Sequence, residues 1–271
     1  MGPIGVFDSG YGGLTILKEI RKTLPQYDYI YLGDNARAPY GTRSFDVVYE
    51  FTLQAVRALF ERGCELVILA CNTASAKALR SIQQKDLPQI DPSKRVLGVI
   101  IPTVEALSNV SKNGNIGVLG TPGTISSGTY DIEIAKFFPA FRTVSMPCPM
   151  WVPLVENKEY DSEGADYFVK KYVEALFSEE PEIDTVVLGC THYPLLLDKI
   201  ERQVGGRAKV ITQGKLVADS LADYLKRHPE MDERCSKGGE VTYLTTEHPD
   251  KFTEMAGVFM QEPVKASRIE L

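Results

Sequence analysis

Two cysteines with similar surroundings are the residues of this sequence best suited to chemistry. Cys71 follows the apolar run Leu66–Ala70, Cys190 follows the apolar run 185–189, and each precedes small polar residues and a helical pattern. Either thiol alone would as readily be a small buried hydrophobe. The polar neighbours favour reactive thiols in both places. If the two thiols flank one small molecule, one can remove a proton from a carbon and the other can deliver one to the opposite face, which inverts a stereocentre.

Three other side chains could assist a thiol. His192 lies two residues after Cys190 and could exchange protons with it or stabilise its thiolate, unless its own backbone satisfies the ring. Asp8 ends the first apolar run and could hold an ammonium group, support a thiol or only cap a helix. Glu156 follows the apolar loop 148–155, where an acid can be partly buried and tuned, although composition alone favours a surface glutamate.

Loops after the apolar runs offer further polar groups. Asp8-Ser9-Gly10-Tyr11-Gly12-Gly13 opens a helix, so its glycines permit a tight turn and its N–H groups favour an anion. The pattern is not GxGxxG, and a nucleotide site is weakly supported. Pro39-Tyr40-Gly41 is by itself a turn signal. The expected loop Gly120–Thr124 could present hydroxyl and N–H donors to a carboxylate.

The elements that must position these residues alternate between strand and helix. Apolar, β-branched runs predict strands at Ile4–Phe7, Tyr29–Leu32, Leu66–Ala70, Val96–Ile101, Ile116–Leu119, Thr143–Met146, Thr185–Leu188, Lys209–Thr212 and Val241–Leu244. Helical patterns cover Leu14–Leu24, Ser44–Glu61, Ser75–Gln84, Thr103–Ser111, Asp131–Phe137, Asp166–Phe177, Leu195–Val204, Leu216–Arg227 and Pro249–Met260. This alternation, with strands apolar at consecutive positions, predicts an α/β fold with parallel sheets.

The two series of elements resemble each other. Cys71 and Cys190 lie 119 residues apart, and the runs that open at Ile4 and Ile116 lie 112 residues apart. Two near-equal offsets indicate an internal duplication. We therefore expect one domain of residues 1–98 plus a returning tail, 211–271, and a second domain of residues 99–210.

Composition excludes several classes of protein. The 271 residues are 44% hydrophobic and carry a formal net charge of −6, which excludes overall disorder and argues against a nucleic-acid partner. Five cysteines without a CxxC pair, and only three histidines, fit neither a disulfide framework nor a metal site. No signal peptide or membrane-spanning run is recognisable. We expect a cytoplasmic protein whose thiols stay free.

Several motifs together resemble those of the glutamate racemase family. They are Phe7-Asp8-Ser9-Gly10 with Gly12-Gly13, Pro39-Tyr40-Gly41, Ala70-Cys71-Asn72-Thr73-Ala74 and Gly189-Cys190-Thr191-His192-Tyr193-Pro194. They occur in order across nearly the whole chain. The resemblance implies two pseudo-symmetric α/β domains with the active site at their interface, and racemisation of glutamate without a cofactor, which supplies D-glutamate for peptidoglycan. It also implies a cytoplasmic enzyme, and we expect a homodimer.

The resemblance also assigns the site. Cys71 and Cys190 are implied as the paired acid/base residues, with Cys190 abstracting the proton from L-glutamate, and Asp8, His192 and Glu156 as auxiliary groups. The implied substrate-binding residues are Asp8, Ser9, Tyr40, Gly41, Asn72, Thr73, Thr121, Thr124, Thr191 and His192.

Three alternatives remain open. The first is a related racemase or decarboxylase acting on aspartate or a hydantoin, although aspartate racemases tend to carry Glu where this chain has His192. The second is a cysteine hydrolase with Cys190 as nucleophile and His192 as base, for which the duplicated Cys71 would have no use. The third is a binding module for glutamate.

Overall fold

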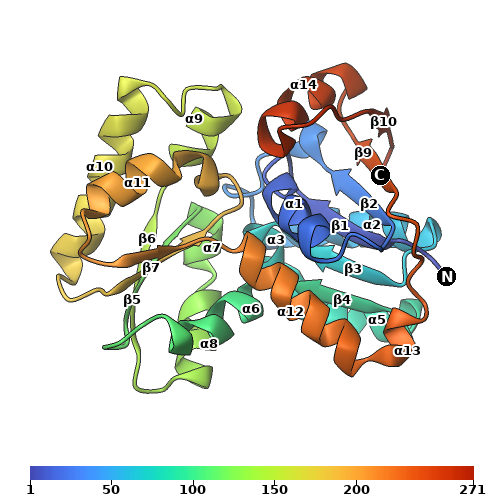
Figure 1. Cartoon of the computed structure of the whole chain (residues 1–271), viewed down its shortest axis with the longest axis horizontal. Coiled ribbons are helices and arrows are strands. Elements are labelled where there is room, and N and C mark those ends of the chain that lie inside the picture. Colours follow the sequence, from blue (N-terminus) through green and yellow to red (C-terminus); the bar gives the residue numbers. More distant parts are fainter.

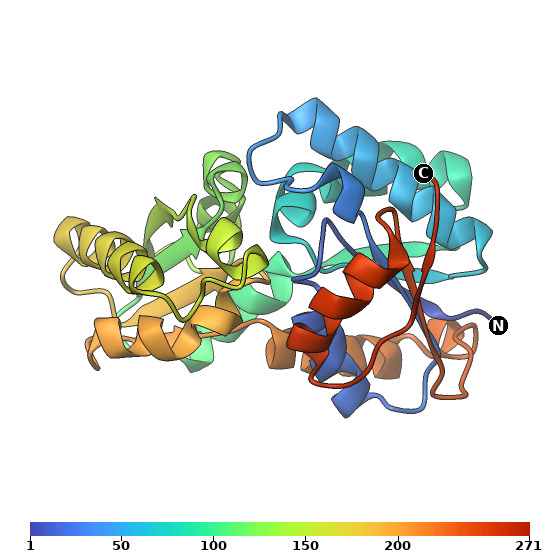
Figure 2. The ribbon, with the colours of Figure 1, turned by 90° about the horizontal axis from the view of Figure 1, so that it is seen from above.

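Two parallel β-sheets form the framework of the chain. The computed structural model describes residues 1–271 and separates them into two lobes, seen side by side in Figures 1 and 2. The first sheet has the strand order β10-β9-β2-β1-β3-β4. Its strands are β1 (Ile4–Asp8), β2 (Tyr29–Gly33), β3 (Leu66–Leu69), β4 (Arg95–Gly98), β9 (Val241–Thr245) and β10 (Ala266–Arg268).

The second sheet repeats the core of the first. Its order is β6-β5-β7-β8, with β5 (Asn115–Gly120), β6 (Arg142–Pro147), β7 (Thr185–Gly189) and β8 (Lys209–Ile211). The order β2-β1-β3-β4 in the first sheet is the same when β5 is matched to β1, and all neighbouring strands are parallel. Cys71 and Cys190 follow the matched strands β3 and β7. The predicted parallel α/β fold is confirmed.

Helices cover the sheets and link the lobes. Those packed around the first sheet are α1 (Leu14–Thr23), α2 (Phe45–Glu61), α3 (Asn72–Lys77), α4 (Leu79–Ser81), α5 (Leu87–Ile90), α12 (Gly214–Arg227), α13 (Pro229–Asp232) and α14 (Pro249–Met260). The second lobe has α7 (Pro122–Ser126), α8 (Thr129–Phe137), α9 (Trp151–Glu156), α10 (Glu163–Glu179) and α11 (Leu197–Val204). Helix α6 (Ile100–Glu105) and the start of α12 lie where the lobes meet (Figure 1).

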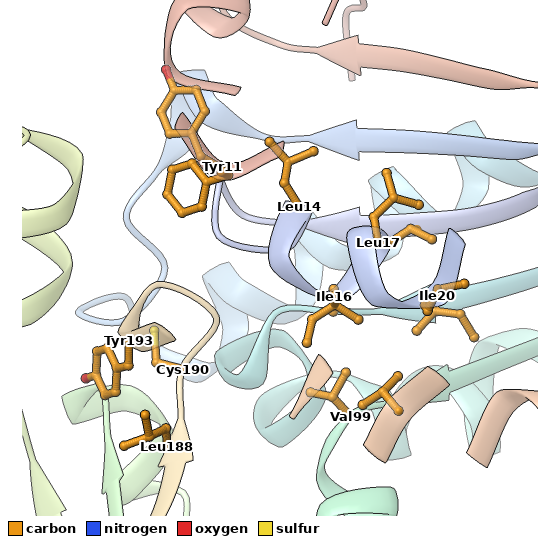
Figure 3. Close-up of a cluster of buried hydrophobic side chains, with 14 of the residues drawn as sticks. Tyr11, Leu14, Ile16, Leu17, Ile20, Val99, Leu188, Cys190 and Tyr193 are labelled. Carbon is orange, nitrogen blue, oxygen red and sulfur yellow. The ribbon is translucent and has the colours of Figure 1, made fainter. Parts of the chain in front are cut away.

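Apolar periodicity explains how these elements pack. Strands β1 and β7 are buried at every position, as expected for parallel strands covered on both faces. In α1, Leu14, Leu17 and Ile20 recur at helical spacing and are buried against the sheet. Figure 3 shows these α1 side chains on one side of the largest apolar cluster, with Leu188, Cys190 and Tyr193 on the other. Cys190 is therefore anchored in core packing close to where the polar site begins.

Several expected boundaries are wrong. The strand expected over Val96–Ile101 ends at Gly98, and α6 begins at Ile100; Pro102 is tolerated there because the first turn of a helix leaves its N–H groups unpaired. The helix expected over Ser75–Gln84 begins earlier, at Asn72, and breaks at Ala78. It then continues through a π-helical segment, Ile82–Asp86. Short 3-10 segments lie at Asn35–Arg37, Ala106–Asn109 and Tyr193–Leu196.

Some short elements were not expected. Strand β10 has three residues and lies at a sheet edge, too short to give a periodic signal. The segment 120–124 is not an extended loop, because α7 begins at Pro122, and Glu156 ends helix α9 rather than following a loop.

All five cysteines are free and buried. No helix combines the length and the apolarity that crossing a bilayer requires.

Candidate active site

One cavity between the lobes brings the predicted residues together. Its volume is about 230 Å³, and both Cys71 and Cys190 line it. Of the residues predicted for the site, Ser9, Tyr40, Gly41, Asn72, Thr73, Thr121, Glu156, Thr191 and His192 also line it. Asp8 and Thr124 do not line it; both are buried directly behind lining residues. The carboxyl ends of the matched strands β3 and β7 therefore face a common space.

The surroundings of Cys71 favour its protonated, neutral thiol form. Cys71 is the N-cap residue of α3, where its Sγ accepts from Ala74 N–H at 3.5 Å and its thiol donates to Ser9 Oγ at 3.4 Å. Burial, reinforced by the nearby Asp8 carboxylate, raises the pKa of Cys71 to about 12. At neutral pH Cys71 is a protonated thiol, ready to donate.

Asp8 connects the two lobes beneath the cavity floor. Its Oδ2 accepts from Gly10 N–H at 2.9 Å, and its Oδ1 accepts from the Thr191 hydroxyl of the other lobe at 3.4 Å. Burial raises the pKa of Asp8, and the charge of His192 and the backbone donors oppose that rise. Asp8 is fully buried and does not line the cavity. It can influence the site through its hydrogen bond to Thr191 and through the effect of its charge on the Cys71 thiol.

Cys190 has a different neighbour, a histidine held by an acid. His192 Nδ1 lies 3.8 Å from Cys190 Sγ, and His192 Nε2 lies 3.1 Å from Glu156 Oε1. Burial of the ring opposes its protonation, but the hydrogen bonds and charges of Cys190 and Glu156 outweigh burial and raise the pKa of His192 to about 10. The ring is therefore an imidazolium at neutral pH and can stabilise a thiolate at Cys190.

The glycine-rich loop after β1 permits this close approach. A Cβ on Gly12 would overlap the Thr191 hydroxyl and lie 2.5 Å from His192 Nδ1. Only glycine lets the loop of the first lobe pack directly on the Cys190-Thr191-His192 segment of the second. The loop therefore serves contact between the lobes, whereas its sequence had suggested an anion-binding turn.

Three threonine hydroxyls form a compact donor group. The oxygen atoms of Thr73 and Thr121 lie 2.9 Å apart, those of Thr73 and Thr124 3.2 Å, and those of Thr121 and Thr124 3.0 Å. Thr73 comes from the first lobe and the other two from the second. Such a group can donate to a carboxylate bound in the cavity.

Tyr40 and Gly41, which were predicted to bind substrate, make hydrogen bonds within the protein. The Tyr40 hydroxyl donates to the buried Asp34 carboxylate, so it is already engaged. The Gly41 carbonyl accepts from Gly123 N–H of the other lobe at 2.7 Å. This hydrogen bond joins the lobes at the cavity.

Replacing Gly123 by alanine should disturb that junction. An added Cβ would lie 2.8 Å from the Gly41 carbonyl oxygen, a backbone atom that cannot move alone. Overpacking of this kind typically costs about 1–3 kcal/mol. We expect a lower melting temperature and weaker ligand binding, measured by calorimetry. Gly257→Ala is the control, because a Cβ there meets no atom within 4 Å. Equal melting temperatures in both variants would contradict the junction.

The charge of Glu156 should set the protonation of His192. The hydrogen bond and the charge of Glu156 both help to raise the pKa of His192, so Glu156→Gln should lower that pKa. NMR titration of the ring measures this, with His228 and His248 as internal references and the exposed Glu159→Gln as control. An unchanged His192 pKa in Glu156→Gln would refute the acid–histidine pair.

Sequence reasoning missed some residues of the site. Cys148, which was not among the predicted site residues, lines the cavity; it is buried and directly follows β6. Tyr130 and Gln213 contact Asn72 but come from distant parts of the chain. No local pattern marks either one, because their contacts arise only from the packing of the lobes.

Comparison with known proteins agrees with this site. Residues 5–222 match the Asp/Glu/hydantoin racemase family. The glutamate racemase of Dinoroseobacter shibae is 40% identical over 277 aligned positions, covering 98% of each chain. The structure of glutamate racemase isoform RacE1 from Bacillus anthracis superposes with a TM-score of 0.90 at 33% identity, covering 100% of this chain and 98% of that one.

A second structure carries a ligand. The glutamate racemase of Francisella tularensis in complex with D-glutamate gives a TM-score of 0.88 at 32% identity, covering 99% of this chain and 97% of that one. These matches span both lobes and the whole cavity between them. The resemblance seen in the sequence motifs is confirmed, and the chain belongs to the Asp/Glu/hydantoin racemase family of isomerases.

Proposed function

We propose that this protein interconverts L- and D-glutamate by moving protons at Cα between Cys190 and Cys71. The observation that carries the proposal is the pair of thiols that follow matched strands and line one cavity. The similarity to glutamate racemases over nearly the full chain supports glutamate as the substrate. The product D-glutamate would supply peptidoglycan synthesis in the cytoplasm, and we propose a homodimer as the working form.

The two thiols have environments suited to opposite roles. A reaction through both faces of Cα needs one thiolate and one thiol at the start of each turnover. The imidazolium of His192 favours the thiolate at Cys190, whereas burial and Asp8 hold Cys71 as a thiol. This asymmetry supports Cys190 as the base toward L-glutamate and Cys71 as the acid.

Each step then balances without a cofactor. The Cys190 thiolate takes the Cα proton of L-glutamate and becomes a thiol, and the electron pair stays on the substrate. The Cys71 thiol gives its proton to the opposite face and becomes a thiolate, which releases D-glutamate. For D-glutamate the same steps run in reverse. The thiols return to their starting state by exchanging protons with solvent or neighbouring groups.

The intermediate carbanion is the difficult point on this path. The Cα proton is far less acidic than a thiol, so negative charge that develops on the substrate must be stabilised by fixed donors in a site that excludes water. The hydroxyls of Thr73 and Thr121, with buried Thr124 behind them, are positioned to donate to a carboxylate. We propose Ser9, Gly41, Asn72 and Thr191 as further substrate contacts, with Tyr40 shaping the wall.

A substrate panel tests this function. Circular dichroism follows the loss of optical activity with L-glutamate, L-aspartate or a 5-substituted hydantoin, without added pyridoxal phosphate. We expect turnover of both glutamate enantiomers and little with the others. Preferred turnover of aspartate or a hydantoin would reassign the substrate. A covalent acyl-enzyme seen by mass spectrometry would instead favour a hydrolase.

A further inference from the structure

We infer that Tyr130 and Gln213 are positioning residues that hold the Asn72 carboxamide in one orientation and thereby present a donor to the substrate. The inference rests on the proposed function and adds to it the reason for carboxylate recognition at this point of the cavity. It depends on a buried group of polar side chains that links the lobes beside Cys71.

These side chains close a ring of hydrogen bonds. Asn72 Nδ2 donates to Gln213 Oε1 at 2.6 Å, Gln213 Nε2 donates to Tyr130 Oη at 2.9 Å, and Tyr130 Oη donates to Asn72 Oδ1 at 2.8 Å. The three residues are at most 3% exposed. Each of the three side chains both donates and accepts within the ring, which is how buried polar groups are stabilised.

Thr103 fixes the direction of the hydrogen bonds. Its hydroxyl donates to the Val99 carbonyl at 2.7 Å, so its oxygen can only accept from a further partner. The atom that faces this oxygen, at 2.9 Å, is Gln213 Nε2. With the amide nitrogen of Gln213 held there, its carbonyl must face Asn72, and Asn72 must turn its own nitrogen toward Gln213. A reversed ring would require Thr103 to abandon Val99.

The ring lies where both connections between the lobes pass. Val99 and Thr103 belong to the first crossing, after β4, and Gln213 belongs to the second, after β8. Tyr130 comes from α8 of the second lobe, and Asn72 from the start of α3 in the first. The ring therefore fixes the position of the second lobe relative to Asn72, the residue that directly follows Cys71.

The consequence for ligand binding concerns the second hydrogen of Asn72 Nδ2. The ring uses one N–H of this group, and no other protein atom accepts the second one. Asn72 lines the cavity, so this N–H can serve a bound carboxylate. A flipped carboxamide would present an oxygen instead and repel the same carboxylate. Tyr130 and Gln213 thus act on the substrate through Asn72 without touching it.

Tyr130→Phe is the sharpest test, because it removes one hydroxyl and keeps the ring that packs in the core. A lost hydrogen bond of ordinary strength corresponds to a change of about 2–10-fold. We expect the KM for L-glutamate to rise within that range and kcat to change less than about twofold, since the reacting thiols are untouched. Gln213→Ala should have the same effect or a larger one.

A double-mutant cycle separates positioning from general destabilisation. If Tyr130 acts through Asn72, then Tyr130→Phe should leave kcat/KM unchanged in an Asn72→Ala background. Tyr29→Phe is the matched control, because that buried hydroxyl donates to the Leu24 carbonyl at 2.7 Å in the first lobe, outside the cavity lining. The control should lower the melting temperature without changing KM.

Three results would overturn the inference. They are a wild-type KM in Tyr130→Phe, an equal loss of kcat/KM with and without Asn72, and a KM shift in the Tyr29→Phe control as large as that in Tyr130→Phe. Wild-type turnover of glutamate is measured first, so failure of the proposed function is recognised separately. In that event, hydrogen exchange of the Asn72 side-chain amide still tests the ring: exchange should be slow in the wild type and faster in Tyr130→Phe.

Discussion

Replacing either Cys71 or Cys190 by alanine should lower kcat for racemisation by about 10⁴-fold in both directions, the upper end of what one acid/base group contributes. In the proposed mechanism each thiol serves one face of Cα, so loss of either leaves one face without a proton donor or acceptor. Activity is measured by circular dichroism with each enantiomer. The effect should be equally severe for both variants, although the two thiols have different neighbours.

The remaining cysteines provide matched controls. Cys64 and Cys235 are buried and do not line the cavity, whereas Cys148 lines it without a cysteine counterpart in the other lobe. We expect Cys64→Ala and Cys235→Ala to keep kcat close to the wild-type value, and Cys148→Ala to keep it within about tenfold, because a changed wall is a smaller loss than a missing acid/base group. A Cys71→Ala variant with near wild-type turnover would eliminate the two-thiol mechanism.

The single-thiol variants should retain a partial reaction. With Cys71 replaced, Cys190 can still remove the Cα proton of L-glutamate and return a solvent proton to the same face. L-glutamate in deuterated buffer should therefore gain deuterium slowly without becoming D-glutamate. The Cys190→Ala variant should do the same with D-glutamate only. If Cys71→Ala instead labelled D-glutamate and Cys190→Ala labelled L-glutamate, the assignment of the two thiols to the two faces would have to be reversed.

The second large effect concerns His192. His192→Asn removes the imidazolium beside Cys190 and the partner of Glu156, so a thiolate that forms at Cys190 during the proposed proton transfer would lack a neighbouring positive charge. We expect kcat to fall by about 10²–10³-fold, within the range for a group that assists proton transfer. His228→Asn, which changes a partly exposed histidine outside the cavity lining, should have no effect.

The position of His192 also predicts an asymmetry. L- and D-glutamate have equal free energies in water, so kcat/KM must fall equally in both directions. The asymmetry must appear in the Cα deuterium isotope effect, which should increase most for L-glutamate because proton transfer to Cys190 becomes slower. Isotope effects that rise equally for both enantiomers would place His192 in a general structural role.

The two proposed acid/base residues could be picked out from the sequence because each directly follows a strand. In parallel sheets the chain ends of strands lie at one edge, so Cys71 after β3 and Cys190 after β7 were expected near a ligand. The consecutive apolar positions of β1 and β7 made those strands recognisable, and the helix Pro249–Met260 was predicted with its observed boundaries. The repeated spacing between the halves matches the repeated strand order.

Contacts between distant segments were not predictable. Gln213 follows a short edge strand and reads as an ordinary helix start, yet its amide joins Asn72, Thr103 and Tyr130. Cys148 lies after an exposed strand end and has no polar neighbours in sequence that would mark it. Such positions acquire their meaning from tertiary packing, which overrides local propensity.

Hydrogen-isotope transfer in the first turnover tests the two-thiol account most directly. L-glutamate is incubated with the wild-type protein in deuterated buffer, and both enantiomers are separated and weighed by mass spectrometry at low conversion. We expect the D-glutamate formed to carry deuterium at Cα and the remaining L-glutamate to keep its protium, because in the two-thiol mechanism different thiols serve the two faces. D-glutamate that retains the original protium would show one group acting on both faces and would contradict the account.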